Sequence, residues 1–122
     1  MKGKTLFLAS MILLLLTVPA FAAYKVEPLP DGTYEVTFTY QTNAEDVFLI
    51  GEFNNWVEND EALRMTKNAE GIHEITITLA KGTYEYKFFA DGQYYTDPTN
   101  PDVVGAFANS LATVTSVECR ES

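Results

Sequence analysis

The stretch EYKFFADGQYYTDPTNP, residues 85–101, carries the pattern that decides the fold. Its first residues alternate, so that Tyr86 and Phe88 face one side of an extended chain and Lys87 and Phe89 face the other. A period of two is typical of a β-strand with one face in the core. The stretch therefore predicts a strand that buries an aromatic face and presents a lysine on its other side.

The next feature is the dipeptide Asp91-Gly92. An Asp-Gly pair favours a two-residue β-hairpin, because glycine adopts positive φ without a steric penalty. Tyr94 and Tyr95 then lie on the returning strand and point to opposite faces. We expect one of them to enter the core and the other to face out. The two prolines of the quoted stretch stiffen the loop that follows, because proline fixes φ.

The same period of two recurs along the chain. Five further segments are predicted to be strands, at residues 33–41, 45–51, 62–66, 72–80 and 109–117. The continuous apolar run at 47–50 indicates a central strand that is covered on both faces. Turn signals separate the strands, and no stretch after residue 23 has a helical period. Short strands at regular spacing predict an all-β sandwich.

The first 22 residues have the pattern of a cleaved signal peptide. Lys2 and Lys4 precede an apolar run over residues 6–18, and small residues stand before a cut after Ala22. A membrane anchor is the alternative, but the apolar run is shorter than the roughly 20 residues that cross a bilayer. We therefore expect residues 23–122 to form a single domain that is exported to the periplasm or secreted.

Charge narrows the range of partners. The chain has 8 basic and 17 acidic residues, and removal of residues 1–22 leaves a net charge of -11. Such a surface repels phosphate backbones and anionic membranes, so nucleic acid is excluded as a partner, and so is a membrane after signal cleavage. Cys119 has no internal partner for a disulfide. It is interpreted as a thiol on the C-terminal tail, with an intermolecular bridge as the alternative.

Catalytic chemistry has little support in the sequence. The single histidine, His73, lies in an alternating strand and is expected to face solvent. Neither a metal site nor a phosphate-binding loop nor a serine nucleophile can be named, and no cofactor is expected. Asp91, Asp97 and Asp102 are interpreted as turn-forming, solvated residues. The sequence therefore predicts that the protein is not an enzyme.

A binding site has better support. Trp56, the only tryptophan, lies in the asparagine-rich turn GEFNNW, residues 51–56. A polar turn favours an exposed indole. Sugar rings have apolar C–H faces and hydroxyl edges, so a site for them needs flat aromatic faces together with hydrogen-bonding groups. Trp56 and one tyrosine of the hairpin are suited to the first requirement.

The combination of VFLIGEFNNW (47–56), YKFFADGQYYTDP (86–98) and a later Asn109 resembles carbohydrate-binding module family 48, and in particular the glycogen-binding domain of the AMP-activated kinase β-subunit. The resemblance covers about residues 45–115. It implies an immunoglobulin-like β-sandwich of the early-set type. This implication agrees with the strand prediction made from the residues themselves.

The resemblance also implies a site. Two tryptophans of the family stack on glucose rings, and their positions fall on Trp56 and Tyr94. The lysine and the asparagine that bond the sugar hydroxyls fall on Lys87 and Asn109.

The chain departs from the family pattern at two points. Tyr94 replaces a tryptophan, which keeps a flat face but reduces it. A bulky aliphatic position of the family falls on Gly105, so either Phe107 takes over that contact or the contact is absent. Phe107 and Asn55, which lies in the turn that carries Trp56, are therefore the auxiliary candidates.

The leading hypothesis is an exported, non-catalytic module that binds an α-glucan such as glycogen or starch. A separate glucan-active enzyme that uses this module for targeting is a candidate partner, and so is another protein. The alternative is an envelope module for protein–protein interaction, with the same sandwich and no sugar binding. A glucan-active enzyme has the least support, because no acid–base pair can be named.

Overall fold

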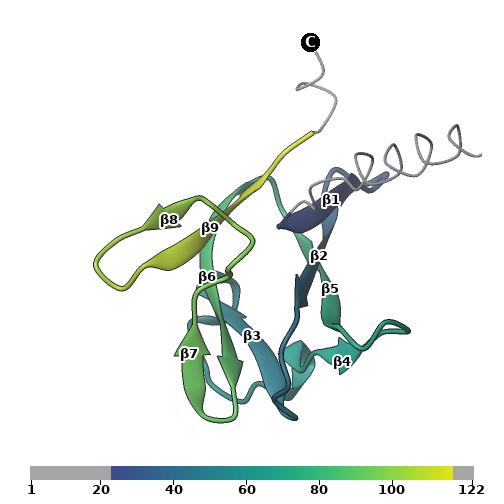
Figure 1. Cartoon of the computed structure of the whole chain (residues 1–122). Coiled ribbons are helices and arrows are strands. Elements are labelled where there is room, and N and C mark those ends of the chain that lie inside the picture. Colours follow the sequence, from purple (N-terminus) through teal and green to yellow (C-terminus); the bar gives the residue numbers. More distant parts are fainter. Residues whose placement is uncertain (1–22, 117–122) are drawn as a thin grey trace, which may run out of the picture.

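The computed structural model describes residues 23–116, which form two antiparallel β-sheets packed face to face (Figure 1). One sheet has the order β1-β2-β5-β4, and the other has the order β3-β6-β9-β8, with β7 also paired to β6. The strands are β1 (Tyr24–Pro28), β2 (Tyr34–Tyr40), β3 (Val47–Gly51), β4 (Thr66–Lys67), β5 (His73–Leu79), β6 (Gly82–Ala90), β7 (Gln93–Tyr95), β8 (Val103–Val104) and β9 (Asn109–Val114).

Two 3₁₀ turns, η1 (Glu52–Asn54) and η2 (Glu61–Leu63), lie between β3 and β4. The described residues contain no α-helix, and hence none that is long and apolar enough to span a membrane. The prediction of an all-β sandwich is confirmed. The predicted signal peptide, residues 1–22, lies outside the described residues, as do Val117 and Cys119.

The core lies between the two sheets and is built from alternate residues. Val36 and Phe38 of β2 and Tyr86 and Phe88 of β6 are each 0% exposed. The ring centroids of Phe38 and Tyr86 are 4.8 Å apart in an edge-to-face contact across the two sheets. Full burial of a side chain of this size contributes about 2–3 kcal/mol. The predicted inward face of β6 is thus confirmed.

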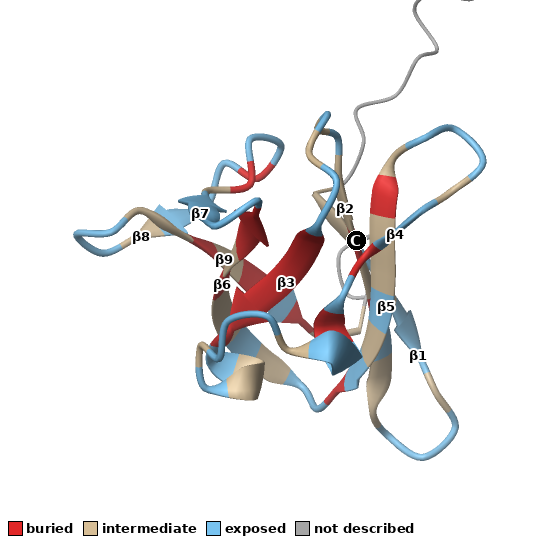
Figure 2. Cartoon of the chain, turned by 90° about the horizontal axis from the view of Figure 1, so that it is seen from below, coloured by how far each residue is buried: buried red, intermediate tan, exposed pale blue. Residues whose placement is uncertain are grey.

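Strand β3 is buried along its whole length, as Figure 2 shows. Its alternate residues Phe48 and Ile50 turn away from the core and form a second apolar cluster with Phe89 on the outer face of the sheet. The prediction of two covered faces is confirmed, but the prediction of a central position is wrong. β3 is the terminal strand of its sheet, and the Arg64 guanidinium covers Phe48 at 4.6 Å from the ring centroid.

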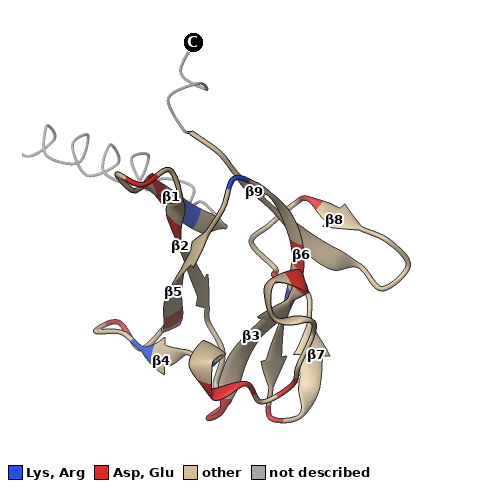
Figure 3. Ribbon diagram, turned by 180° about the vertical axis from the view of Figure 1, so that it is seen from behind, with Lys and Arg blue, Asp and Glu red and all other residues tan. Residues whose placement is uncertain are grey.

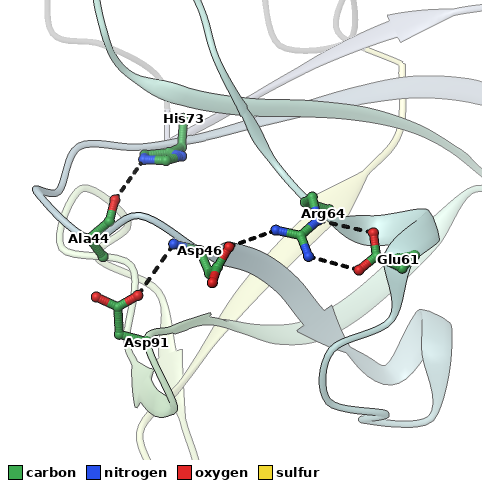
Figure 4. Close-up of polar contacts among 6 residues, drawn as sticks. All are labelled: Ala44, Asp46, Glu61, Arg64, His73 and Asp91. Carbon is green, nitrogen blue, oxygen red and sulfur yellow. Dashed lines mark hydrogen bonds and ion pairs between the residues drawn. The ribbon is translucent and has the colours of Figure 1, made fainter.

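The predicted strand at 62–66 is only partly present. Ala62 and Leu63 belong to η2, because the Asp60 carboxylate accepts a hydrogen bond from the Ala62 N–H and caps the turn. The chain then forms an isolated bridge to Phe48 at Arg64 before β4 begins. Arg64 ties this segment down through ion pairs of 2.8 Å with Asp46 and with Glu61 (Figure 4).

The prediction that His73 faces solvent is wrong. The side chain is 1% exposed, and its Nε2 lies 3.2 Å from the carbonyl oxygen of Ala44 (Figure 4). The reason is the strand period itself. His73 shares its face of β5 with Ile75, Ile77 and Leu79, and that face packs on the core.

The hairpin between β6 and β7 forms as predicted. Asp91 and Gly92 adopt φ of 47° and 82° between the paired residues Ala90 and Gln93. Both φ values are positive, as a type I′ turn requires.

The two tyrosines of β7 pair with opposite faces of β6, since Tyr94 is opposite Phe89 and Tyr95 is opposite Phe88. The prediction that one of them enters the core is wrong, because they are 47% and 43% exposed. The place beside Phe88 is taken by Tyr40, whose ring stacks on it at 4.4 Å.

Candidate functional site

The outer face of β6 carries an open hollow of about 590 Å³. Six residues from separate segments line it: Trp56, Glu85, Lys87, Tyr94, Phe107 and Asn109. The structure thus brings together the four residues predicted as a sugar-binding set and the auxiliary residue Phe107. It does not bring Asn55 to the hollow.

Trp56 forms one wall because the chain turns sharply after β3. Its N–H donates to the carbonyl oxygen of Gly51 at 3.0 Å, and it adopts a φ of 55°, which is uncommon for a residue other than glycine. The Asn54 side chain fixes this turn, since its Oδ1 accepts from the Gly51 N–H at 3.1 Å and its Nδ2 donates to the carbonyl oxygen of Val57 at 3.1 Å.

The indole is half-buried rather than fully exposed. It packs on the outer cluster of Phe48, Ile50 and Phe89, which supports one side of the ring. A ring held in this way loses little conformational freedom when a ligand stacks on it. The second apolar cluster of the fold therefore supports the Trp56 wall of the hollow.

Gly51 allows the turn to lie close to β6. A Cβ at this position would be 2.6 Å from the Glu85 carbonyl oxygen and 2.8 Å from Cζ of Phe53. Contacts below 3.0 Å are not tolerated without a backbone shift, so only glycine fits here. The glycine of the GEFNNW motif thus lets the turn that carries Trp56 lie directly against β6.

Asn55 has a backbone role. It is exposed, adopts a left-handed φ of 57°, and ends η1 with its N–H donating to the carbonyl oxygen of Glu52. Asparagine is one of the few residues that adopt this conformation readily. The backbone geometry of the turn that carries Trp56 therefore accounts for an asparagine at position 55, and no ligand contact is needed to explain it.

Tyr94 supplies a second aromatic wall. Its ring lies 4.9 Å from that of Phe89, so the rings of Trp56 and Tyr94 share a support. Its hydroxyl donates to the Glu58 carboxylate, and this hydrogen bond raises the pKa of the Tyr94 hydroxyl. The contact joins the β6–β7 hairpin to the loop that carries Trp56.

Lys87 is half-buried at the floor of the hollow. Its Nζ donates to Thr96 Oγ1 at 2.9 Å and to the carbonyl oxygen of Ala108 at 3.3 Å. Burial lowers its pKa, and none of the carboxylates in residues 23–116 pairs with it. An ammonium has three N–H donors, so one remains for a ligand.

The side chains of Asn109 on β9 and Glu85 on β6 meet diagonally, because the residue paired with Glu85 is Leu111. The Asn109 Nδ2 donates to Glu85 Oε1 at 3.0 Å. Glu85 was given no role from the sequence, yet it lines the hollow. The available signal was the period of two, because Glu85 stands two residues before Lys87 on the same face of β6.

The segment between β7 and β9 contains β8, and its turn between β8 and β9 forms the remaining wall and presents Phe107, which is 78% exposed. A buried polar cluster holds the preceding loop, between β7 and β8. The Tyr86 hydroxyl donates to Asp97 Oδ2 at 2.7 Å, the Asn100 Nδ2 donates to the Tyr86 oxygen at 3.0 Å, and the Asp97 N–H donates to Ser110 Oγ at 2.9 Å.

Asp97 is 1% exposed, so its interpretation as a solvated residue is wrong. Its second oxygen still serves a turn, because Oδ1 accepts from the N–H and the hydroxyl of Thr99.

The residues of the hollow are suited to binding a ligand. It has aromatic walls and a floor of hydrogen-bonding groups, and in residues 23–116 no three His, Cys, Asp or Glu side chains gather into a metal-binding set. Rings with polar groups between them suit a ligand with apolar faces and hydroxyl edges. A β-sandwich with such a site belongs to the class of carbohydrate-binding modules.

Comparison with known proteins identifies the family. Residues 30–120 match the family described as the glycogen recognition site of AMP-activated protein kinase, and the chain belongs to this family. The family resemblance seen in the sequence is thereby confirmed. The family is a non-catalytic carbohydrate-binding module, in agreement with the prediction that the chain is not an enzyme.

Several curated proteins are similar to this chain. The β-1 subunit of 5′-AMP-activated protein kinase from Rattus norvegicus is 32% identical over 75% of this chain and 30% of its own length. Protein PTST homolog 2, chloroplastic, from Arabidopsis thaliana is 33% identical over 62% of this chain and 14% of its own. Protein FLOURY ENDOSPERM 6, chloroplastic, from Oryza sativa subsp. japonica is 33% identical over 66% of this chain and 15% of its own. The chain thus spans less than a third of these relatives.

Proposed function

We propose that this protein binds α-glucans, such as glycogen or starch, in the hollow of Trp56 and Tyr94, and that it does so without chemical change to the sugar. The observation that carries the proposal is the convergence of Trp56, Lys87, Tyr94 and Asn109 on one open surface. The two aromatic rings stack on glucose rings, while the Lys87 ammonium and the Asn109 amide bond the hydroxyls. Phe107 extends the apolar surface at the rim.

The expected affinity is low. Stacking on two rings removes about 80 Å² of apolar surface from water at each ring, which contributes about 4 kcal/mol in total. Hydrogen bonds add to this figure and the ordering of ligand and loop subtracts from it. The net corresponds to a dissociation constant of about 1 mM for one site. Repeated engagement along a polymer raises the apparent affinity.

The test is affinity electrophoresis in gels that contain glycogen or soluble starch. The polysaccharide should retard the wild type, and the double variant Trp56→Ala, Tyr94→Ala should migrate as in a gel without sugar. Tyr95→Ala is the matched control, because Tyr95 is exposed to nearly the same degree but lies on the opposite face of the hairpin. Equal migration of wild type and double variant would refute the proposal.

Two features of the wider protein form part of the same proposal. The basic head, apolar run and small residues of positions 1–22 support export to the periplasm or the medium. The two-sheet topology supports assignment of the sandwich to the early-set immunoglobulin-like type. A mass of the purified protein that corresponds to a chain starting at Ala23 would support export, and a full-length mass in the extracytoplasmic fraction would contradict cleavage.

A protein partner is the second candidate function, either a glucan-active enzyme that this module targets or another envelope protein. The exposure of Phe107, at 78%, favours it, because large exposed aromatic side chains are common at interfaces. Pull-down from an extract, with and without maltoheptaose, separates the two functions. A partner whose capture ignores both the sugar and the Trp56→Ala substitution would favour the interaction module.

A further inference from the structure

Glu85 has a fixed place in the hollow. It is half-buried in the middle of β6, on the outward face that also carries Lys87. Its backbone N–H donates to Glu52 Oε1 at 2.9 Å, which ties β6 to the start of η1. Its Oε1 accepts from Asn109 at 3.0 Å. The backbone and the side chain of Glu85 are therefore both held, and the residue lines the hollow.

This contact sets the direction of the Asn109 amide. An ionised carboxylate only accepts hydrogen bonds, so the amide atom that faces it is the nitrogen. The Oδ1 of Asn109 is then directed away from Glu85. Without a neighbour of fixed polarity, the two amide ends would be nearly interchangeable, because they differ little in shape. Glu85 thus makes Asn109 an acceptor toward a ligand.

The floor of the hollow consequently has a defined polarity. The Glu85 carboxylate and the Asn109 amide oxygen supply acceptors, and Lys87 Nζ has one donor left after its two hydrogen bonds. A neutral sugar satisfies this pattern, because each hydroxyl donates one proton and also accepts. A phosphate monoester does not, because its oxygens are acceptors that carry negative charge and meet the Glu85 carboxylate.

We propose that Glu85 is a ligand-contacting residue of this site, that it orients the Asn109 amide, and that it makes the site select uncharged glucans over phosphorylated ones. The proposal rests on the proposed function. The charge distribution agrees with it. Lys87 is the one cation among the six lining residues, and the Glu58 carboxylate accepts a hydrogen bond from the hydroxyl of Tyr94. Figure 3 also shows more acidic than basic residues along the described chain, mainly at its turns.

The experiment is an NMR titration with phosphorylated maltodextrin and with the same sample after phosphatase treatment. We expect the wild type to bind the dephosphorylated sample more tightly by roughly fivefold or more. Glu85→Gln keeps the shape but removes the charge. It should weaken binding of the neutral sugar on the order of fivefold and bring the ratio between the two ligands close to one. Glu35→Gln, an equal change of charge on an exposed position of β2, is the control and should keep the wild-type ratio.

A polarity swap tests the orientation of the amide. Asn109→Asp places two carboxylates opposite each other and should weaken binding. Adding Glu85→Gln to that variant restores a donor, because the glutamine amide can donate to the aspartate, and should recover part of the lost affinity. A role in folding alone would move thermal stability in parallel with affinity, so each variant is melted. Recovery of binding without a matching recovery of stability supports orientation.

The outcomes separate the two proposals. If the wild type binds neither sugar, the proposed function fails and this inference fails with it. If the wild type binds both sugars equally, or Glu85→Gln keeps the wild-type affinities and ratio, the inference is overturned while glucan binding stands. If the double variant binds no better than Asn109→Asp, the orientation role is overturned.

Discussion

Tyr86→Phe is the substitution that most directly tests how the binding wall is held. The variant keeps a buried ring in the core and removes one hydroxyl group. That hydroxyl donates to Asp97 Oδ2 at 2.7 Å and accepts from Asn100 Nδ2 at 3.0 Å. All three residues are at most 5% exposed, so water cannot replace the lost partner. The loop between β7 and β8, which leads through β8 to the turn that carries Phe107, loses one of its anchors to β6.

The expected loss of stability follows from these contacts. A hydrogen bond to a charged acceptor contributes about 1.5–3 kcal/mol, and an incompletely satisfied buried carboxylate adds to the cost of its removal. The Asn100 amide keeps its other contact, to the carbonyl oxygen of Leu111 at 3.0 Å, and contributes little. We expect the free energy of unfolding to fall by about 2–4 kcal/mol. For a domain of this size the melting temperature then falls by roughly 10–25 °C.

Urea denaturation of wild type and variant measures this difference. Tyr84→Phe is the matched control, because its hydroxyl makes one exposed hydrogen bond, to the carbonyl oxygen of Ala80 at 2.8 Å. The control should lose less than about 1 kcal/mol. A loss at Tyr86→Phe no larger than at Tyr84→Phe would refute the reasoning that the buried cluster anchors the loop.

The same hydroxyl predicts a dependence on pH. Burial, and then the charge of Asp97, raise the pKa of the Tyr86 hydroxyl well above its usual range. In the unfolded chain the pKa of a tyrosine hydroxyl is about 10. The folded state therefore disfavours the ionised form, and this contribution to stability is complete below pH 10 and is lost as the pH rises above it. The stability difference between wild type and Tyr86→Phe should be constant below about pH 10 and should narrow above it. A constant difference up to pH 11 would contradict the assignment.

Three further predictions concern the walls of the hollow. Gly51→Ala should destabilise the fold by about 2–4 kcal/mol in urea, because the added Cβ meets the Glu85 carbonyl oxygen at 2.6 Å, and wild-type stability would show that the close approach is not needed. Tyr94→Trp should strengthen binding of maltoheptaose about threefold in an NMR titration, because the larger ring buries more sugar surface, and weaker binding would mean that the Glu58 contact matters more than ring area. Asn55→Gly should keep both glucan retardation and stability within about 0.5 kcal/mol, because glycine also adopts its left-handed φ, whereas a loss of binding alone would show that the side chain reaches the ligand.

The sequence by itself determined the features that depend on neighbours along the chain. The period of two gave the inward face of β6, and Asp91-Gly92 gave the hairpin, because strand alternation and turn chemistry are local. The motif positions also predicted which residues would gather at the site. The burial of His73 was also encoded locally, although the prediction placed this residue in solvent, because the period that turns Ile75 inward turns His73 inward too.

Only the tertiary structure decided which distant groups meet. Tyr95 stays exposed because Tyr40 from another sheet occupies the place beside Phe88. Asp97 is buried because Tyr86 and Ser110 approach it from β6 and β9. Glu85 becomes part of the site because the Asn109 amide reaches it from the neighbouring strand β9. Alternation fixes the face on which a side chain lies. Which partner stands opposite depends on how two sheets pack and on the path of the loops, and no local pattern encodes either of these.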